Sequence, residues 1–307
     1  MQKILVTGGS GMVGKNLIEF LQTSSDYQIF SPTRKEFDLL NQNQVNLYLQ
    51  NLSPEIVIHC AGLVGGIQAN INKPYSFLYE NIMMGANIIN ASSNNNIRKL
   101  INLGSSCMYP KDCNTELNED SILSGKLEPT NEGYALAKIS VGKLCQFIKK
   151  EKKLNYKTLI PCNLYGKWDN FDSEKSHMIP AAIKKIHNAK LNKSVPVIWG
   201  DGMSRREFMY VEDLCSFIKF SLSNYDDLDD YTNVGLGYDY SIKEYYEIIS
   251  KVIGYDGKFS FDLDKPKGMN KKLCSIKKQT KMGWKPTVSI EEGIRLTYNF
   301  YKENHEI

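Results

Sequence analysis

The sequence predicts an α/β protein built on a doubly wound parallel sheet, with a smaller, interleaved C-terminal domain. Three observations support this fold class. Short apolar runs alternate with amphipathic stretches up to residue 165, as in a parallel sheet covered by helices. A glycine-rich turn joins the first run to the first amphipathic stretch. Beyond Gly166 the alternation stops, yet residues 232–235 read as a strand that returns to the sheet.

The bulk properties of the chain exclude several functional classes. Its 307 residues are 42% hydrophobic and 23% charged, which is typical of a globular protein. The net charge of +4 is spread along the chain, so we expect no nucleic-acid partner. The longest uncharged apolar stretch, residues 56–67, is too short to cross a bilayer, so we expect no membrane contact.

Cysteine usage favours a reducing compartment. The chain has seven cysteines at wide spacing and contains no Cys-x-x-Cys. This pattern argues against a disulfide framework and against a zinc site, so we expect no metal. The first apolar run also ends at Gly8, so it is shorter than the apolar region that a signal peptide needs. We therefore expect a cytoplasmic protein.

The first strand and helix frame a dinucleotide-binding turn. Residues 3–7 read as a buried strand, and a helical pattern follows from residue 13 to residue 21. Glycines recur between them at every third position, so backbone N–H groups and the helix N-terminus are able to approach a pyrophosphate. The alternative is an ordinary Gly-rich turn. This Rossmann-type arrangement assigns to the cofactor Gly8, Gly11, Met12, Val13 and Gly14.

The end of the second strand favours a phosphorylated cofactor. Residues 27–30 form this strand, and no acidic residue follows to bind a free ribose 2′-hydroxyl. Arg34 and Lys35 follow instead, and a guanidinium suits a 2′-phosphate. The cofactor is therefore expected to be NADPH/NADP+ rather than NAD. Alternatively, both are solvated loop charges.

The remaining sheet elements follow in order. Apolar, β-branched runs predict strands at 55–61, 99–103 and 158–161. Helical periodicity predicts helices at 45–52, 79–96 and 134–153. Ser105, Ser106 and Cys107 come directly after the 99–103 strand, at the carboxyl edge where open α/β sheets bind ligands. We assign these three side chains to the substrate site.

Tyr134 and Lys138 lie four residues apart and share one helix face. A phenol normally titrates near ~10, and an ammonium beside it favours phenolate and lowers its pKa. The pair is thus expected to move protons at neutral pH. The alternative is a solvated surface pair.

Beyond residue 166 we expect helices at 179–189, 211–222, 240–253 and 289–301, and a strand at 195–199. The first domain then comprises residues 1–165 and about 211–240. The second comprises 166–210 and 241–307. They are interleaved rather than joined in tandem.

Linked motifs in order resemble the extended short-chain dehydrogenase/reductase family along nearly the whole chain. Within it, the likeness is to enzymes that convert GDP-4-keto-6-deoxy-mannose to GDP-fucose. The motifs are GMVG (11–14), VGGI (64–67), GSSCMYPK (104–111), LEPTNE (127–132), YALAK (134–138), NLYG (163–166), DNF (169–171) and REF (206–208). The resemblance implies an NADP-binding domain and a sugar-nucleotide-binding domain.

The resemblance implies two reactions at one ketone. C3 and C5 are inverted first, with Cys107 as base and His177 as acid, and the C4 ketone is then reduced with NADPH. Tyr134 gives the proton, Lys138 lowers the pKa of Tyr134 and holds the nicotinamide ribose, and Ser105 binds the C4 oxygen. The structural alternatives are a buried filler for Cys107 and a surface residue at a helix start for His177.

The remaining ligand contacts are also implied by the resemblance. Asn163 positions the nicotinamide or the sugar. Trp199 stacks on guanine, Arg206 and Lys272 bind the diphosphate, and Lys185 lies near the substrate. Further cofactor contacts are expected from Asp38, Leu39, Ala61, Pro161, Leu164 and His177.

The sequence departs from the family pattern at several positions. Ser10 stands where the family has Arg, and Gly133 where it has Pro before the catalytic Tyr. These changes leave the exact sugar open. One alternative is a C4 reductase only, acting on a GDP-4-keto-6-deoxy-heptose in surface (capsule) polysaccharide sugar biosynthesis. A remote alternative is a non-catalytic NADP-binding sensor. A homodimer is expected through the helices near 81–96 and 134–153.

Overall fold

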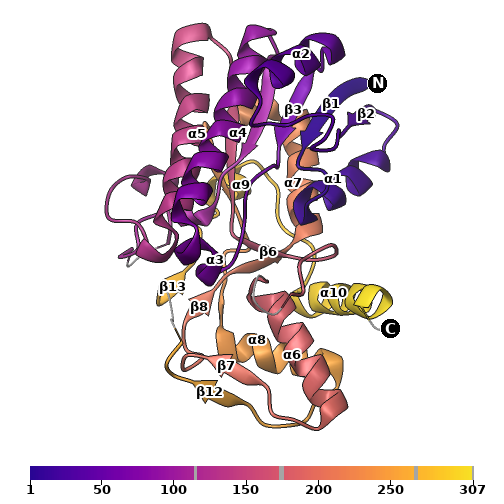
Figure 1. The fold of residues 1–307 in the computed structure, drawn as a ribbon, viewed down its shortest axis with the longest axis vertical. Helices are drawn as coiled ribbons and strands as arrows, with labels where there is room; N and C mark the ends of the chain where they lie inside the picture. The colour runs from indigo at the N-terminus through magenta and orange to yellow at the C-terminus, as the bar shows by residue number, and fades with distance from the viewer. Residues whose placement is uncertain (114–115, 173–175, 266–268, 306–307) are drawn as a thin grey trace.

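A six-stranded parallel sheet forms the centre of the larger part of the molecule. The computed structural model describes residues 1–113, 116–172, 176–265 and 269–305. The strand order is β10-β5-β4-β3-β1-β2 (Figure 1). The strands are β1 (Gln2–Thr7), β2 (Tyr27–Phe30), β3 (Ile56–His59), β4 (Lys99–Leu103), β5 (Lys157–Pro161) and β10 (Tyr231–Val234). The predicted doubly wound sheet is confirmed, including the late strand that returns to it.

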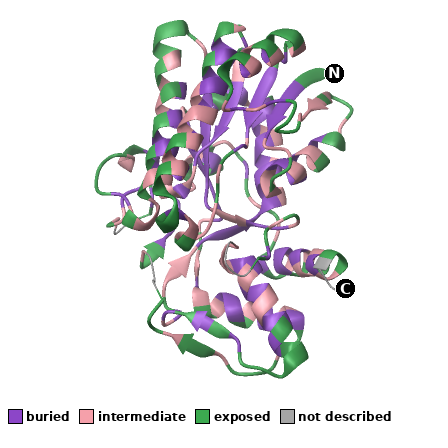
Figure 2. Cartoon of the chain, viewed as in Figure 1, coloured by how far each residue is buried: buried purple, intermediate pink, exposed green. Residues whose placement is uncertain are grey.

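Helices cover both faces of this sheet. On one face α4 (Pro74–Asn94) packs against α5 (Glu132–Lys152) and α2 (Gln42–Leu52), and on the other α1 (Met12–Gln22) packs against α7 (Val211–Ser223) (Figure 1). Alternate strand residues enter separate cores: Leu5, Val57 and Leu100 form part of one cluster, and Ile4, Ile58 and Ile101 form part of the other. Figure 2 shows the inner strands of the sheet buried and the outer helix faces exposed, and the edge strand β2 has no buried residue.

The strand order places a ligand crevice beside β1. β2 pairs with one side of β1 and β3 with the other, so the chain reverses direction across the sheet at β1. Open α/β sheets bind ligands outside the carboxyl ends of strands at such a switch point. The glycine turn after β1 and the loop after β3 meet there.

The second part of the molecule has its own core. Helices α6 (Met178–Asn192), α8 (Ile242–Ile253) and α10 (Ile290–His305) pack together (Figure 1). Ile183, Ile249 and Ile294 are fully buried in their shared apolar cluster. Short strand pairs complete it: β7 (Val197–Trp199) with β12 (Ser260–Asp262), β6 (Asn163–Tyr165) with β9 (Phe208–Tyr210), and β8 (Arg205–Arg206) between β11 (Tyr240–Ser241) and β13 (Lys271–Lys272).

Several predicted boundaries are wrong by a few residues. The 79–96 helix begins at Pro74, whose fixed φ and missing N–H suit a first helical position. The 240–253 helix begins at Ile242, because Ser241 and Glu244 form a capping box and Tyr240–Ser241 pairs as a strand. Two short helices were not predicted, α3 (Ile67–Asn72) and α9 (Lys277–Lys281).

Glu207 ties three distant segments together. Its side chain is fully buried between β8 and β9. The carboxylate accepts hydrogen bonds from the backbone N–H groups of Leu236 at 2.6 Å, Gly237 at 2.9 Å and Cys274 at 2.9 Å. Burial raises the pKa of Glu207, and these N–H groups partly oppose the rise.

None of the helices that the structure describes is both long and apolar enough to cross a membrane.

Candidate active site

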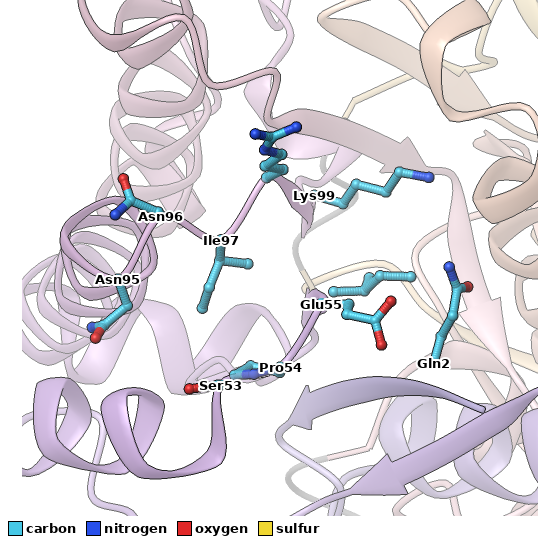
Figure 3. A pocket seen from close by; sticks show the side chains of 10 residues that line it. Gln2, Ser53, Pro54, Glu55, Asn95, Asn96, Ile97 and Lys99 are labelled. Carbon is cyan, nitrogen blue, oxygen red and sulfur yellow. The ribbon is translucent and has the colours of Figure 1, made fainter.

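A surface hollow at the amino end of the sheet is not the candidate site. It has a volume of about 390 Å³ and is lined by Gln2, residues 53–56 and residues 95–99 (Figure 3). These residues precede or begin β1, β3 and β4. The predicted site residues lie at the other end of these strands, where α/β sheets carry their ligands.

The glycine turn is shaped to receive a pyrophosphate. Gly8 has φ +72°, and a Cβ there would lie 2.6 Å from the Ala61 backbone. A Cβ on Gly14 would lie 2.2 Å from the Gly8 carbonyl oxygen, so α1 packs directly on the turn. Within the described residues, no side chain caps α1 at Gly11, where an added Cβ would meet only the Gly8 oxygen, at 3.4 Å. The helix N-terminus beginning at Met12 and Val13 thus fits the dinucleotide that the sequence predicts.

Buried polar side chains fix the loop that faces this turn. Thr7 Oγ1 lies 2.8 Å from His59 Nδ1 and accepts from the Ala61 N–H at 3.3 Å. Asn81 Oδ1 accepts from the Leu63 N–H at 2.9 Å, and Asn81 Nδ2 donates to the Leu63 oxygen at 3.1 Å. Sequence reasoning missed these supports because a lone buried polar residue carries no spacing signal.

Arg34 lies where the sequence places the cofactor's 2′-phosphate, beyond the carboxyl end of β2. Its side chain is 74% exposed, and Nε lies 3.8 Å from Asp38 Oδ1. Leu39 is buried in the core beneath, and its carbonyl accepts from Asn87 Nδ2 at 2.8 Å. The guanidinium is therefore accessible to a ligand, while Leu39 supports the loop.

Ser105, Tyr134 and Lys138 gather at the carboxyl end of β4. The Ser105 hydroxyl lies near enough to the Tyr134 phenol to oppose the rise in its pKa. Lys138 Nζ is 5.7 Å from the Tyr134 ring centroid and donates to the Leu103 carbonyl at 2.8 Å. The departure at Gly133 has a steric reason, since a Cβ there would lie 2.7 Å from the Pro74 carbonyl oxygen.

The predicted lowering of the pKa of Tyr134 is wrong for this structure. Burial raises the pKa of Tyr134, the nearby Cys107 raises it further, and the Ser105 hydroxyl only partly offsets them. Burial also disfavours the charged form of Lys138 and lowers its pKa to about 8, although Cys60 and Cys107 act to raise it. The ammonium faces a carbonyl rather than the phenol oxygen, so desolvation dominates.

Cys107 lies among polar groups from three segments. Its Sγ accepts from Asn131 Nδ2 at 3.1 Å and from Lys272 Nζ at 3.4 Å. Arg206 is also close, since Cys107 and Glu128 oppose the lowering of the Arg206 pKa by burial. Lys272 was predicted to bind a diphosphate, whereas the contact seen is with sulfur. Asn131 was not predicted as a site residue.

His177 lies apart from this cluster in the contacts seen. It precedes α6, and its carbonyl accepts from the Ala181 N–H at 3.1 Å. Between described residues, no hydrogen bond joins His177 to Cys107. Burial lowers the pKa of His177, which favours the neutral ring.

The remaining predicted ligand contacts divide between the two parts of the molecule. Trp199 is 46% exposed, and Lys185 Nζ and Lys265 Nζ lie 5.1 and 5.3 Å from its ring centroid. Asn163 is held by a bond from Nδ2 to the Glu207 carbonyl at 2.8 Å. Of three others, Ser106 is buried in the short 3-10 helix after β4, Pro161 is buried at the end of β5, and Leu164 is half-buried within β6.

Comparisons with known proteins agree with this geometry. The model of the NAD dependent epimerase/dehydratase family matches residues 4–237. GDP-L-colitose synthase of Yersinia pseudotuberculosis is 53% identical over 301 residues, covering 97% of each chain. GDP-L-fucose synthase of Azorhizobium caulinodans is 47% identical, covering 100% of this chain and 98% of the relative.

A solved structure shows the same fold. The GDP-mannoheptose C4 reductase from Campylobacter jejuni with NADP bound has a TM-score of 0.89 and 32% identity, covering 98% of each chain. The family resemblance read from the motifs is thus confirmed over the full length. The chain belongs to the NAD dependent epimerase/dehydratase family, within the extended short-chain dehydrogenase/reductases.

Proposed function

We propose that this protein is an NADPH-dependent epimerase/reductase of a GDP-4-keto-6-deoxy sugar. The single observation that carries the proposal is the grouping of a phenol, a hydroxyl and a thiol, from Tyr134, Ser105 and Cys107, at the carboxyl end of β4. Relatives at 53% and 47% identity are named as synthases of GDP-L-colitose and GDP-L-fucose, which supports a GDP-linked sugar.

For the reduction, NADPH supplies a hydride when bound. Ser105 and Tyr134 donate hydrogen bonds to the ketone oxygen and polarise the carbonyl. Because burial raises the pKa of Tyr134, the phenol stays protonated until charge develops on that oxygen, and it then gives up its proton. The Lys138 ammonium, 5.7 Å from the ring centroid, stabilises the phenolate that remains.

For the epimerisation, the C4 ketone acidifies the protons on C3 and C5. The Cys107 thiolate takes such a proton, and the electron pair of the C–H bond moves into an enolate whose oxygen Ser105 and Tyr134 stabilise. Reprotonation from the opposite face inverts the carbon. We assign that proton to the imidazolium form of His177, which burial disfavours, and the transfer requires the bound sugar to lie between α6 and the β4 end.

Exchange of protons with solvent tests the epimerisation. We expect wild-type enzyme, ketosugar and NADP+ in deuterated water to incorporate deuterium at C3 or C5, because NADP+ has no hydride to transfer. Cys107→Ser should slow this exchange by about 10²–10⁴-fold, the usual contribution of a positioned base. Mass spectrometry of the recovered ketosugar measures it. Cys113→Ser is the matched control, and an unchanged rate in Cys107→Ser would reject sulfur as the base.

A C4 reductase that acts on a GDP-linked heptose is the second candidate. The observation in its favour is the structural match to a GDP-mannoheptose C4 reductase. NADPH oxidation should be measured side by side with 4-keto-6-deoxy hexoses, with and without a C3 hydroxyl, and with the corresponding heptose. Turnover of the heptose without deuterium exchange would favour this candidate.

We propose NADPH as the cofactor, with Arg34 on the 2′-phosphate. Arg34→Ala should raise the Kd for NADPH by about tenfold and leave that for NADH unchanged, since it removes one partly solvated charge-assisted hydrogen bond. Fluorescence titration measures both constants. Arg98→Ala, an exposed arginine beyond α4, is the control. Equal effects on both cofactors would contradict the assignment.

We also propose a homodimer formed through α4 and α5. Tyr79, Leu144 and Phe147 are 48%, 39% and 54% exposed on these adjacent helices. Pairing the helices across a twofold axis would bury these side chains in a four-helix bundle.

A further inference from the structure

The Cys107 sulfur lies between two hydrogen-bond donors from distant segments. Asn131 comes from the turn before α5, and its Nδ2 is 3.1 Å from Sγ. Lys272 comes from β13, and its Nζ is 3.4 Å from Sγ. An ammonium has only donors, so the sulfur acts as acceptor toward Lys272. The N–H side of the Asn131 amide therefore suits the same sulfur, and this fixes which way the amide points.

The Asn131 side chain does not cap α5 in the described structure, although it occupies the N-cap position. Asn131 is the N-cap residue of α5, where an asparagine oxygen ordinarily accepts from an N–H of the first turn. Its side chain makes no such cap bond to the described residues. The amide turns toward Cys107 instead, and the helix forgoes the stabilisation that a side-chain cap gives. Local helix stability does not explain this orientation.

The other end of the amide is buried, and the described part of the chain offers it no partner. Among the described residues, Asn131 Oδ1 has no hydrogen-bond donor. Leaving a buried acceptor unpaired is unfavourable, because the oxygen loses its hydrogen bonds to water, so such an atom calls for an explanation. Asn131 Oδ1 belongs to a side chain that contacts the proposed base. A ligand hydroxyl beside the sulfur would satisfy this oxygen.

We propose that Asn131 positions Cys107 for proton transfer and, through Oδ1, accepts a hydrogen bond from a hydroxyl of the bound ketosugar. This inference rests on the proposed function. The Nδ2–H bond stabilises negative charge on sulfur before the thiolate takes a proton from the sugar carbon. The Oδ1 bond holds the ring so that this carbon faces the sulfur. The Asn131 amide thereby holds both the Cys107 sulfur and the sugar carbon in the geometry that proton transfer needs.

Thiol reactivity tests the first half without any substrate. Asn131→Asp keeps the side-chain shape but replaces the donor with a negative charge, and Asn131→Ala removes the donor alone. Alkylation of Cys107 by iodoacetamide near neutral pH should slow by at least about tenfold in Asn131→Asp and less in Asn131→Ala, with the midpoint of each pH profile moved upward. Peptide mass spectrometry follows Cys107 separately from the other six cysteines.

The control is Asn118→Asp, the same substitution at an exposed residue whose Oδ1 accepts from the Asp120 N–H, as a carboxylate also does. It should leave the Cys107 profile unchanged. NADP+ binding and thermal unfolding verify that the variants fold. Wild-type pH profiles in both Asn131 variants would overturn the positioning role.

Steady-state kinetics test the second half. Asn131→Ala should raise the KM for the ketosugar in NADPH oxidation by about tenfold, as expected for one lost hydrogen bond in a buried site, and leave the Kd for NADP+ unchanged. An unchanged KM would overturn the Oδ1 contact. If wild-type enzyme shows no deuterium exchange, the epimerisation fails, and the alkylation profiles still decide whether Asn131 acts on the sulfur.

Discussion

Tyr134→Phe should abolish most ketosugar-dependent NADPH oxidation while cofactor binding is retained. In the proposed mechanism the phenol is the proton donor to the forming alkoxide, and with Ser105 it polarises the carbonyl. Loss of a positioned general acid reduces kcat by about 10²–10⁴-fold. The ring itself packs edge-on against Phe77, with centroids 6.4 Å apart, and phenylalanine preserves this contact. Absorbance at 340 nm measures the rate.

Tyr75→Phe is the matched control for that substitution, because Tyr75 is 71% exposed and lies on α4. It should oxidise NADPH at the wild-type rate. Isothermal titration with NADP+ should give the same Kd for wild type and for Tyr134→Phe. Wild-type turnover in Tyr134→Phe would reject the proton-donor role.

Glu207→Ala should cause the largest loss of stability among the residues near the site. It leaves the N–H groups of Leu236, Gly237 and Cys274 buried without their acceptor. Each unpaired group costs about 1–3 kcal/mol, so the three groups together cost at least about 3 kcal/mol. Thermal unfolding should occur at least about 5 °C lower. Glu151→Ala, at an exposed position of α5, should leave the Tm unchanged.

The pH dependence of stability gives a second readout for Glu207. Burial raises its folded-state pKa above the ordinary value of 4.5, so the folded protein binds this proton more tightly than the unfolded chain. The contribution of Glu207 to stability is therefore largest below pH 4.5 and falls as pH rises through the raised value. Glu207→Gln does not titrate, so its stability should fall less over this interval. If stability falls equally with pH in wild type and in Glu207→Gln, burial does not raise the pKa of Glu207.

Much of the fold was predictable because local patterns dictate it. Buried parallel strands are mostly apolar runs, and the strand at Lys99–Leu103 has the predicted bounds. The partly exposed edge strand at Tyr27–Phe30 also has them. Residues that act within one turn or one helix were equally predictable. The glycine turn needs its spacing to approach a pyrophosphate, and Tyr134 and Lys138 need theirs to share a helix face.

Residues that meet only through the fold were not predictable in the same way. Asn131 and Lys272 are 141 positions apart, yet both donate to Cys107, and no sequence spacing links them. Glu207 belongs to the REF motif at 206–208, but the motif does not reveal its three backbone partners, which come from two later segments. The boundaries at Pro74 and Ile242 depended on cap geometry that periodicity does not resolve.

The sequence by itself determined the doubly wound sheet and the glycine turn, because each depends on residue types at fixed local spacing. The proposed reacting groups came from the family resemblance of its motifs. Only the tertiary structure decided how those groups are poised. It directs Lys138 to the Leu103 carbonyl, and burial then raises rather than lowers the pKa of Tyr134. Desolvation depends on everything packed around a group, and no pair of residues in the sequence contains that information.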